Sequence, residues 1–126
     1  MDEEERKRWR ERGFAEVLNQ RTGQVFRMGA TYLDDLETHA EAYDPLLAVE
    51  RLKVPLLLVH GTQDDAVPVD DARRLARHAA PGTASLALIQ GAGHTFGAAH
   101  PFTGVGGQLS QVLSRSTGFF LQALSA

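Results

Sequence analysis

The sequence predicts an α/β protein, and three observations carry the prediction. Residues 54–61, VPLLLVHG, form a nearly unbroken apolar run ending in glycine, which is typical of a buried strand in a parallel sheet. A second short apolar run, ASLALIQ, occupies residues 84–90. Between them, VDDARRLARHAA at residues 69–80 repeats its apolar positions at helical spacing. A strand, a helix and a strand in this order favour a right-handed parallel unit with flanking helices.

The elements before this unit are predicted to be helices and a hairpin. Residues 2–12, DEEERKRWRER, place acidic residues four positions before basic ones, which supports an exposed helix. Two short, partly apolar segments then flank RTGQ at residues 21–24, and the glycine in that turn predicts a hairpin. Residues 31–43 are expected to form one helix that ends near Asp44 and Pro45, followed by a short helical or irregular piece over residues 46–53.

The last part of the chain is predicted to be a loop and a helix. GAGHTFG, residues 91–97, follows the second strand, and its glycines suit a sharp loop because glycine permits positive φ and close approach. From about Val105 to Leu124 the apolar residues fall near helical spacing, which indicates a long terminal helix. We expect a single partial domain over residues 1–126, with 1–50 as a cap or connecting segment and 51–126 as the strand–helix unit.

Composition and charge exclude several classes of function. The net charge is −3 and the pI is about 5.9, which argues against a nucleic acid or an anionic membrane as partner. The absence of cysteine rules out a disulfide framework and any thiolate site. The N-terminal residues lack the apolar core of a signal peptide, and no apolar run is long enough to span a bilayer. These signals predict a cytoplasmic protein.

Two loops carry the residues that are best suited to take part in catalysis. In open parallel sheets, functional groups gather just beyond the carboxyl ends of the strands. HGTQDDAVP, residues 60–68, follows the first strand and contains Asp64 and Asp65, whereas GAGHTFG contains His94. Parallel strands lie about 5 Å apart, so loops leaving the same ends can place a carboxylate beside an imidazole. We expect Asp64 to pair with His94, fix its tautomer and stabilise the imidazolium.

Each of these residues also has a plainer interpretation. Asp64 could be an Asx-type turn residue, and His94 could be a loop histidine satisfied by the backbone. We expect His60, at the strand end, to be packed, and His100 to have a structural role although it could border the site. The spacing of His94 and His100 matches no common ligand pattern, so no metal or cofactor is predicted.

HGTQDDAVP, together with GAGHTF, resembles the acid and histidine loops of α/β-hydrolase-fold serine hydrolases. The first loop fits the family pattern H-G-x-x-D-x-x-V-P, which implies that Asp64 rather than Asp65 is the catalytic acid. The resemblance makes His94 the general base. GHTFGAAHPF is similar to the dienelactone-hydrolase-like and serine-aminopeptidase-like branches, and GFAEVLNQRTGQ to the segment before the acid-bearing strand. The resemblance covers nearly the whole chain and implies the C-terminal part of an α/β-hydrolase fold.

The family's nucleophile, a serine in G-x-S-x-G, has no counterpart in this sequence. Ser85 opens a predicted strand at the wrong end, and the other serines lie in or after the terminal helix. In this family the nucleophile precedes the acid, so the resemblance implies that the serine and the oxyanion hole lie upstream of Met1. We therefore expect the C-terminal portion of a hydrolase that cleaves ester, lactone or peptide-like bonds through an acyl-enzyme, and that is inactive alone.

Two alternatives to this interpretation of the chain remain open. In the first, a separate chain supplies the complementing N-terminal half, so that the hydrolase is split between two subunits. The run from Val54 to Val59 would then pair its free edge with a strand of that chain. In the second, the chain is a non-catalytic binding or structural module on a hydrolase scaffold, because a fold does not by itself fix a function.

Overall fold

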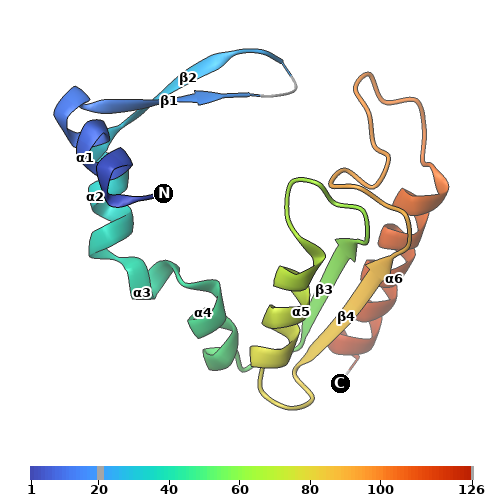
Figure 1. Ribbon diagram of the computed structural model, residues 1–126. Helices are drawn as coiled ribbons and strands as arrows, with labels where there is room; N and C mark the ends of the chain where they lie inside the picture. The colour runs from blue at the N-terminus through green and yellow to red at the C-terminus, as the bar shows by residue number, and fades with distance from the viewer. Residues whose placement is uncertain (20–21, 126) are drawn as a thin grey trace. The chain divides into compact units, whose positions relative to one another are not determined.

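The structure is a computed structural model that describes residues 1–19 and 22–125 (Figure 1). The chain divides into two compact units, Met1–Asp44 and Pro45–Ala126. Both units contain helices and strands, and the second contains the expected parallel pair, so the α/β class is confirmed. The division falls just before a helix, α4 (Pro45–Arg51), which belongs to the second unit.

The first unit begins with helix α1 (Glu3–Arg12), which confirms the helix predicted from the charge run. A capping box starts it: Asp2 accepts from the backbone N–H of Glu5 at 2.8 Å, and Glu5 accepts from the backbone N–H of Asp2 at 3.0 Å. Gly13 ends the helix with φ of 75°. The acidic first turn and the basic last turn both suit the helix dipole.

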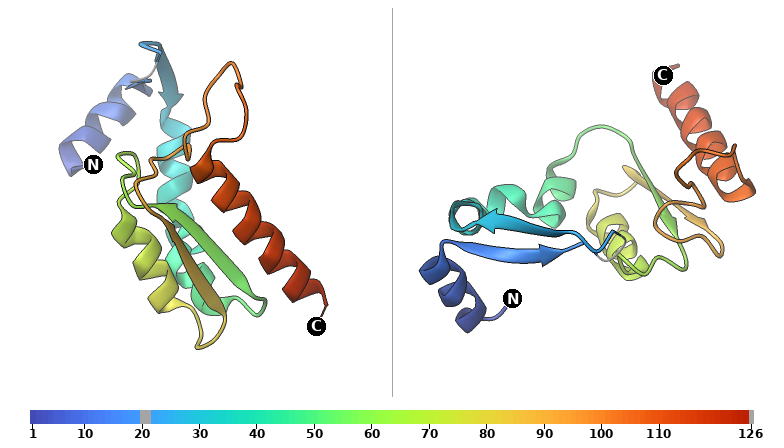
Figure 2. Two further views of the ribbon diagram at one scale, coloured as in Figure 1. Left: turned by 90° about the vertical axis from the view of Figure 1, so that its right-hand side faces the viewer. Right: turned by 90° about the horizontal axis from the view of Figure 1, so that it is seen from above.

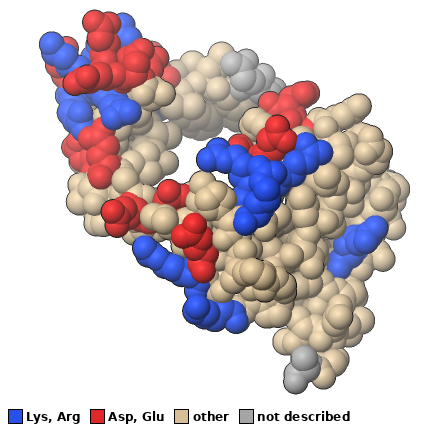
Figure 3. Space-filling model, turned by 60° about the horizontal axis from the view of Figure 1, so that its bottom comes forward, with Lys and Arg blue, Asp and Glu red and all other residues tan. Residues whose placement is uncertain are grey.

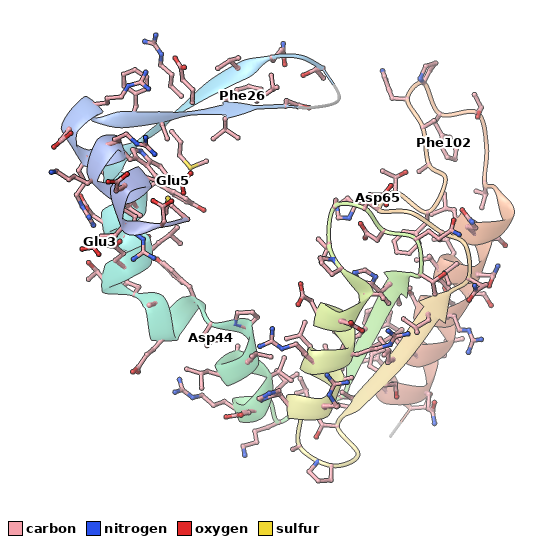
Figure 4. All side chains as sticks on the ribbon, in the orientation of Figure 1. Glu3, Glu5, Phe26, Asp44, Asp65 and Phe102 are labelled. Atoms are coloured by element: carbon pink, nitrogen blue, oxygen red, sulfur yellow. The ribbon has the colours of Figure 1, made fainter. Side chains whose placement is uncertain are left out.

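An antiparallel hairpin follows, as predicted, with strands β1 (Phe14–Leu18) and β2 (Val25–Gly29). Residues 20 and 21, which include part of the predicted RTGQ turn, lie outside the described residues. A hydrogen bond links α1 to the hairpin: the indole Nε1 of Trp9 donates to the carbonyl oxygen of Met28 at 2.9 Å. The far end of the hairpin leaves apolar side chains exposed, among them Phe26 (Figure 4).

The prediction of one helix over residues 31–43 is wrong, because the structure has two helices, α2 (Ala30–Thr38) and α3 (Ala40–Tyr43). The break lies at His39, whose φ of −113° departs from helical geometry. Just before it, the Thr38 hydroxyl donates to the carbonyl oxygen of Asp34 at 2.7 Å. Such bonds to the preceding turn compete with the regular ladder and bend helices.

The second unit contains the parallel pair that the sequence predicts. Strands β3 (Leu56–Gly61) and β4 (Ala84–Ile89) run parallel, with Leu56 opposite Ala84 and Gly61 opposite Ile89. Helix α5 (Val69–His78) connects them and contacts both strands. Helix α6 (Gly107–Leu124) also contacts both, and Figures 1 and 2 show α5 and α6 on opposite faces of the pair. The unit is therefore a small three-layer arrangement of helix, sheet and helix.

The most buried part of the second unit lies at the carboxyl end of this sheet. Ile89, the last residue of β4, is 1% exposed, and Ala92, in the loop that follows, is fully buried. Ala72 of α5 is buried as well. The side chains of β3 keep partial exposure although helices cover both faces, because among the described residues only β4 pairs with this strand. The core therefore lies directly beneath the two loops that carry Asp64 and His94.

Helix α6 presents apolar residues on two sides. Leu109, Val112 and Phe119 are half-buried at helical spacing. Leu113, Phe120 and Leu121 remain more than half exposed. The helix carries one charged residue, Arg115.

Elsewhere, basic and acidic side chains are interspersed on the face drawn in Figure 3. In the part of the chain that the structure describes, no helix combines the length and apolarity that a membrane span requires.

Gly61, the last residue of β3, lies against the backbone of the loop after β4. A Cβ atom at this position would lie 2.2 Å from the carbonyl oxygen of Ala92 and 2.9 Å from that of Gly93. Both neighbours are backbone atoms in a loop whose Ala92 is fully buried, so they cannot move aside as a flexible side chain would. Only glycine fits this approach.

We expect Gly61→Ala to lower the free energy of unfolding by about 3 kcal/mol, the upper end of the usual cost of overpacking, because the clash is with backbone. Urea denaturation followed by circular dichroism measures the change. Gly118→Ala is the matched control, because a Cβ there meets open space within α6, and it should be neutral or stabilising by up to about 1 kcal/mol. Equal stability of the two variants would contradict the close approach at Gly61.

Candidate catalytic site

The two loops at the carboxyl ends of β3 and β4 are joined by hydrogen bonds. The backbone N–H of Thr62 donates to the carbonyl oxygen of Ile89 at 3.1 Å, and that of Gln63 donates to Ala92 at 2.9 Å. In return, the N–H of Gly91 donates to the hydroxyl of Thr62 at 2.8 Å. The loops therefore form one assembly, in which the position of one fixes the position of the other. No pattern in the sequence marks Thr62 for this role, because a threonine after a strand is common.

Asp64 is held in the first loop by two backbone N–H groups. Its Oδ1 accepts from Ala66 at 2.9 Å and from Val67 at 3.0 Å. This is the Asx-type turn that the plainer interpretation anticipated. The side chain is only 5% exposed, so the carboxylate has little freedom to leave this position. Asp65, by contrast, is exposed on the same loop (Figure 4).

The structure brings His94 to the other oxygen of the same carboxylate. The Nδ1 atom of His94 lies 3.0 Å from Oδ2 of Asp64, across thirty residues of sequence. Asp64 therefore serves both as the turn residue and as the partner of the imidazole, one oxygen for each role. The two interpretations of Asp64 that the sequence left open are compatible in one side chain.

The surroundings of Asp64 keep it ionised. The backbone hydrogen bond from Val67 has the largest effect on the pKa. The hydrogen bonds from the imidazole of His94 and from the backbone of Ala66 add to it, whereas burial opposes them. Together they lower the pKa of Asp64 from 3.8 to about 2. An ionised carboxylate only accepts hydrogen bonds, so Nδ1 of His94 must be the donor. The neutral ring then keeps its free lone pair on Nε2, in a side chain that is 61% exposed.

The loop that carries His94 turns sharply through positive φ. Gly91 and Gly97 have φ of 69° and 79°, which agrees with the role expected of these glycines. Phe96 also has a positive φ, 53°, which is unusual for a residue with a side chain. Its backbone N–H donates to the carbonyl oxygen of Gly93 at 3.1 Å, closing a turn around His94. Sequence reasoning missed Phe96, because no pattern marks a bulky residue for this conformation.

The remaining candidates lie in different surroundings. His60 is largely buried, as expected, but its Nε2 lies 3.7 Å from Oδ2 of Asp64, which the sequence did not indicate. His100 is exposed on the long loop before α6. Ser85 lies at the amino end of β4, away from the end where the loops meet, and three further serines lie on α6. The described part of the chain contains no group of three or more residues suited to hold a metal ion.

This geometry is that of a base oriented by an acid. The carboxylate fixes the imidazole tautomer, and a proton taken up on Nε2 would create an imidazolium beside the fixed negative charge. No model of a known protein family matches the chain, and no curated protein matches it. What carries a functional assignment is therefore the pair itself and the two loops that hold it.

The depressed pKa of Asp64 predicts a specific dependence of stability on pH. The contribution of the ionised Asp64 to the free energy of unfolding should be fully present above the ordinary pKa of 3.8. It should be lost as the pH falls toward about 2. We expect wild type to be more stable than Asp64→Asn at pH 6, with a difference that shrinks steadily as the pH approaches about 2. Urea midpoints measured from pH 2 to pH 7 test this, because all other carboxylates are common to both proteins.

Asp65→Asn serves as the control, since it removes the same charge from the same loop at an exposed position. It should change the midpoint much less than Asp64→Asn at pH 6. A difference between wild type and Asp64→Asn that is the same at pH 2 and pH 6 would show that the carboxylate charge is not what these hydrogen bonds stabilise.

Proposed function

We propose that the chain supplies the acid, Asp64, and the general base, His94, of a serine-hydrolase triad in an α/β-hydrolase fold. The nucleophile comes from outside this sequence, either from upstream residues of a longer reading frame or from a second chain. The substrate class is an ester, a lactone or a peptide-like bond, and the reaction passes through an acyl-enzyme. The resemblance of the two loops to this family supplies the substrate class.

One observation carries the proposal: Nδ1 of His94 lies 3.0 Å from Oδ2 of Asp64, and this carboxylate is nearly inaccessible to solvent. A surface ion pair would have two exposed partners and contribute little. Here the acid is fixed by the backbone, and only the base is open to a reacting group. That asymmetry is what proton transfer requires, because the base must reach the substrate while the acid only orients it.

The reaction assigns a proton to each step. As the serine oxygen attacks the carbonyl carbon, its proton passes to Nε2 of His94, and the imidazolium is stabilised by Asp64. Collapse of the tetrahedral intermediate breaks the bond to the leaving group, which takes the proton from Nε2. Water then attacks the acyl carbon and gives a proton to the same nitrogen. Collapse of this second intermediate breaks the bond from the acyl carbon to the serine oxygen, which takes the proton back from Nε2 as the acid product leaves. Nε2 of His94 thus accepts a proton twice and gives it up twice in each turnover.

The location of the pair supports the same proposal. Both loops lie at the carboxyl ends of parallel strands, where open α/β sheets concentrate functional groups. The serines within the described residues are poor substitutes for the nucleophile. Ser85 is at the opposite end of β4, and those on α6 belong to a regular helix rather than to a strained turn after a strand.

The test uses the gene in its own surroundings, with an affinity tag at the 3′ end of the coding sequence. The tagged material is purified and treated with a fluorophosphonate probe, which reacts covalently with activated serines. We expect a labelled polypeptide that either contains this chain or co-purifies with it. His94→Ala should reduce the rate of labelling by about 10²–10⁴-fold, the usual contribution of a general base.

His39→Ala is the control, because it removes an exposed histidine from the other unit, and labelling should continue at the wild-type rate. Label on a longer form of the chain would assign the nucleophile to an upstream segment. Label on a separate polypeptide would assign it to a split hydrolase. Labelling that is absent, or that is indifferent to His94→Ala, would overturn the proposal and favour a non-catalytic module.

A further inference from the structure

The first unit contains a cavity that the proposed function does not use. The cavity lies between α1 and β1, which Figure 1 labels, and its volume is about 710 Å³. Sites that hold small molecules usually have volumes of this order. The lining comes mainly from one face of α1 and from the first three residues of β1. The cavity therefore belongs to the unit Met1–Asp44.

Two aromatic side chains form the apolar floor of the cavity. Trp9 is 9% exposed, and its indole is held by the hydrogen bond to the hairpin. Its ring also stacks on Tyr32, with the ring centroids 6.4 Å apart. Phe14 is half-buried, and the guanidinium carbons of Arg12 and Arg27 lie 4.9 and 4.6 Å from the centroid of its ring. These contacts hold the floor in place, which lowers the cost of ordering it when a ligand binds.

The charged side chains that line the cavity differ in how they are paired. The carboxylate of Glu5 accepts a hydrogen bond within the capping box of α1. One oxygen of Glu16 lies 4.0 Å from Nη2 of Arg12, and the other lies 3.8 Å from Nε of Arg27. Arg8, by contrast, forms no hydrogen bond or ion pair with any residue that the structure describes. Because a guanidinium carries five N–H donors, those of Arg8 are available to a ligand.

These features favour a ligand that combines a negative charge with an aromatic ring. A guanidinium binds a carboxylate through two parallel hydrogen bonds, and an aromatic ring packs well against the side chains of Trp9 and Phe14. The three arginines in and beside the cavity outnumber its two glutamates, although the chain as a whole carries a net charge of −3. This local excess of positive charge attracts an anion and disfavours a cation.

We propose that this cavity binds a small aromatic carboxylate. The carboxylate group lies on the guanidinium of Arg8, and the aromatic ring lies against Trp9 and Phe14. The inference does not depend on the proposed function, because Asp64 and His94 belong to the other unit. It assigns a binding role to the part of the chain that the sequence predicts to be a cap or connecting segment.

The test follows the indole N–H signal of Trp9 in ¹H–¹⁵N correlation spectra of the purified, isotope-labelled chain. The chain contains one tryptophan, so this signal needs no further assignment. The unlabelled probe is indole-3-acetate, and indole-3-acetamide is its neutral counterpart of nearly the same shape. Both are titrated at constant pH and ionic strength. We expect the signal to shift saturably with the acid, with a Kd of about 1 mM, as is typical of a ligand with about a dozen non-hydrogen atoms.

Arg8→Gln should raise the Kd for indole-3-acetate about tenfold, because it removes a charge-assisted pair of hydrogen bonds. For the same reason, the amide should bind wild type about tenfold more weakly than the acid does. Arg6→Gln is the matched control: it removes the same charge from α1, but Arg6 pairs with Glu37 and does not line the cavity. The Kd of this control should stay near that of wild type.

Circular dichroism checks that the variants fold, and the comparison of acid with amide in wild type decides the matter if Arg8→Gln does not. A Trp9 signal that fails to shift saturably with indole-3-acetate would overturn the proposal. Equal binding of the acid and the amide would also overturn it, as would an effect of Arg6→Gln as large as that of Arg8→Gln. None of these outcomes concerns the pair of Asp64 and His94, so the proposed function would stand.

Discussion

The parallel pairing of β3 with β4 is the constraint on which the site depends. Because Gly61 and Ile89 are register partners, both strands end at the same level and release their loops side by side. The missing side chain of Gly61 then lets the second loop pass directly against the first. A slip in register would move the acid and histidine loops apart and would also bring a side chain against the carbonyl of Ala92.

Asp64 shows how one small side chain can meet a structural and a chemical requirement together. Oδ1 supplies the acceptor that closes the turn, and Oδ2 faces the imidazole. The hydrogen bonds that make the turn also keep the group ionised, because backbone N–H groups stabilise the charged form. The turn and the negative charge beside the imidazole of His94 therefore have the same origin, and neither can be altered without the other.

Regular patterns made most of this arrangement predictable, and irregular features were missed. The helix over the charge run, the hairpin, the parallel pair and the approach of Asp64 to His94 follow from periodicity, turn residues and the geometry of parallel sheets. The break at His39 and the positive φ of Phe96 depend on individual hydrogen bonds. The place of His60 beside Asp64 depends on side-chain direction at a strand end, which spacing alone does not encode.

The hydrogen bond between Asp64 and His94 joins residues thirty positions apart, and a single helix lies between their strands. Forming such a contact requires closure of a loop of about thirty residues, and pairing of parallel strands across a crossover helix is intrinsically slow. Every residue of the pair's surroundings, from β3 to the histidine loop, lies within one continuous stretch of sequence. We therefore expect Asp64 and His94 to come together only after β3 and β4 have paired, although all the parts of their surroundings come from one stretch of the chain.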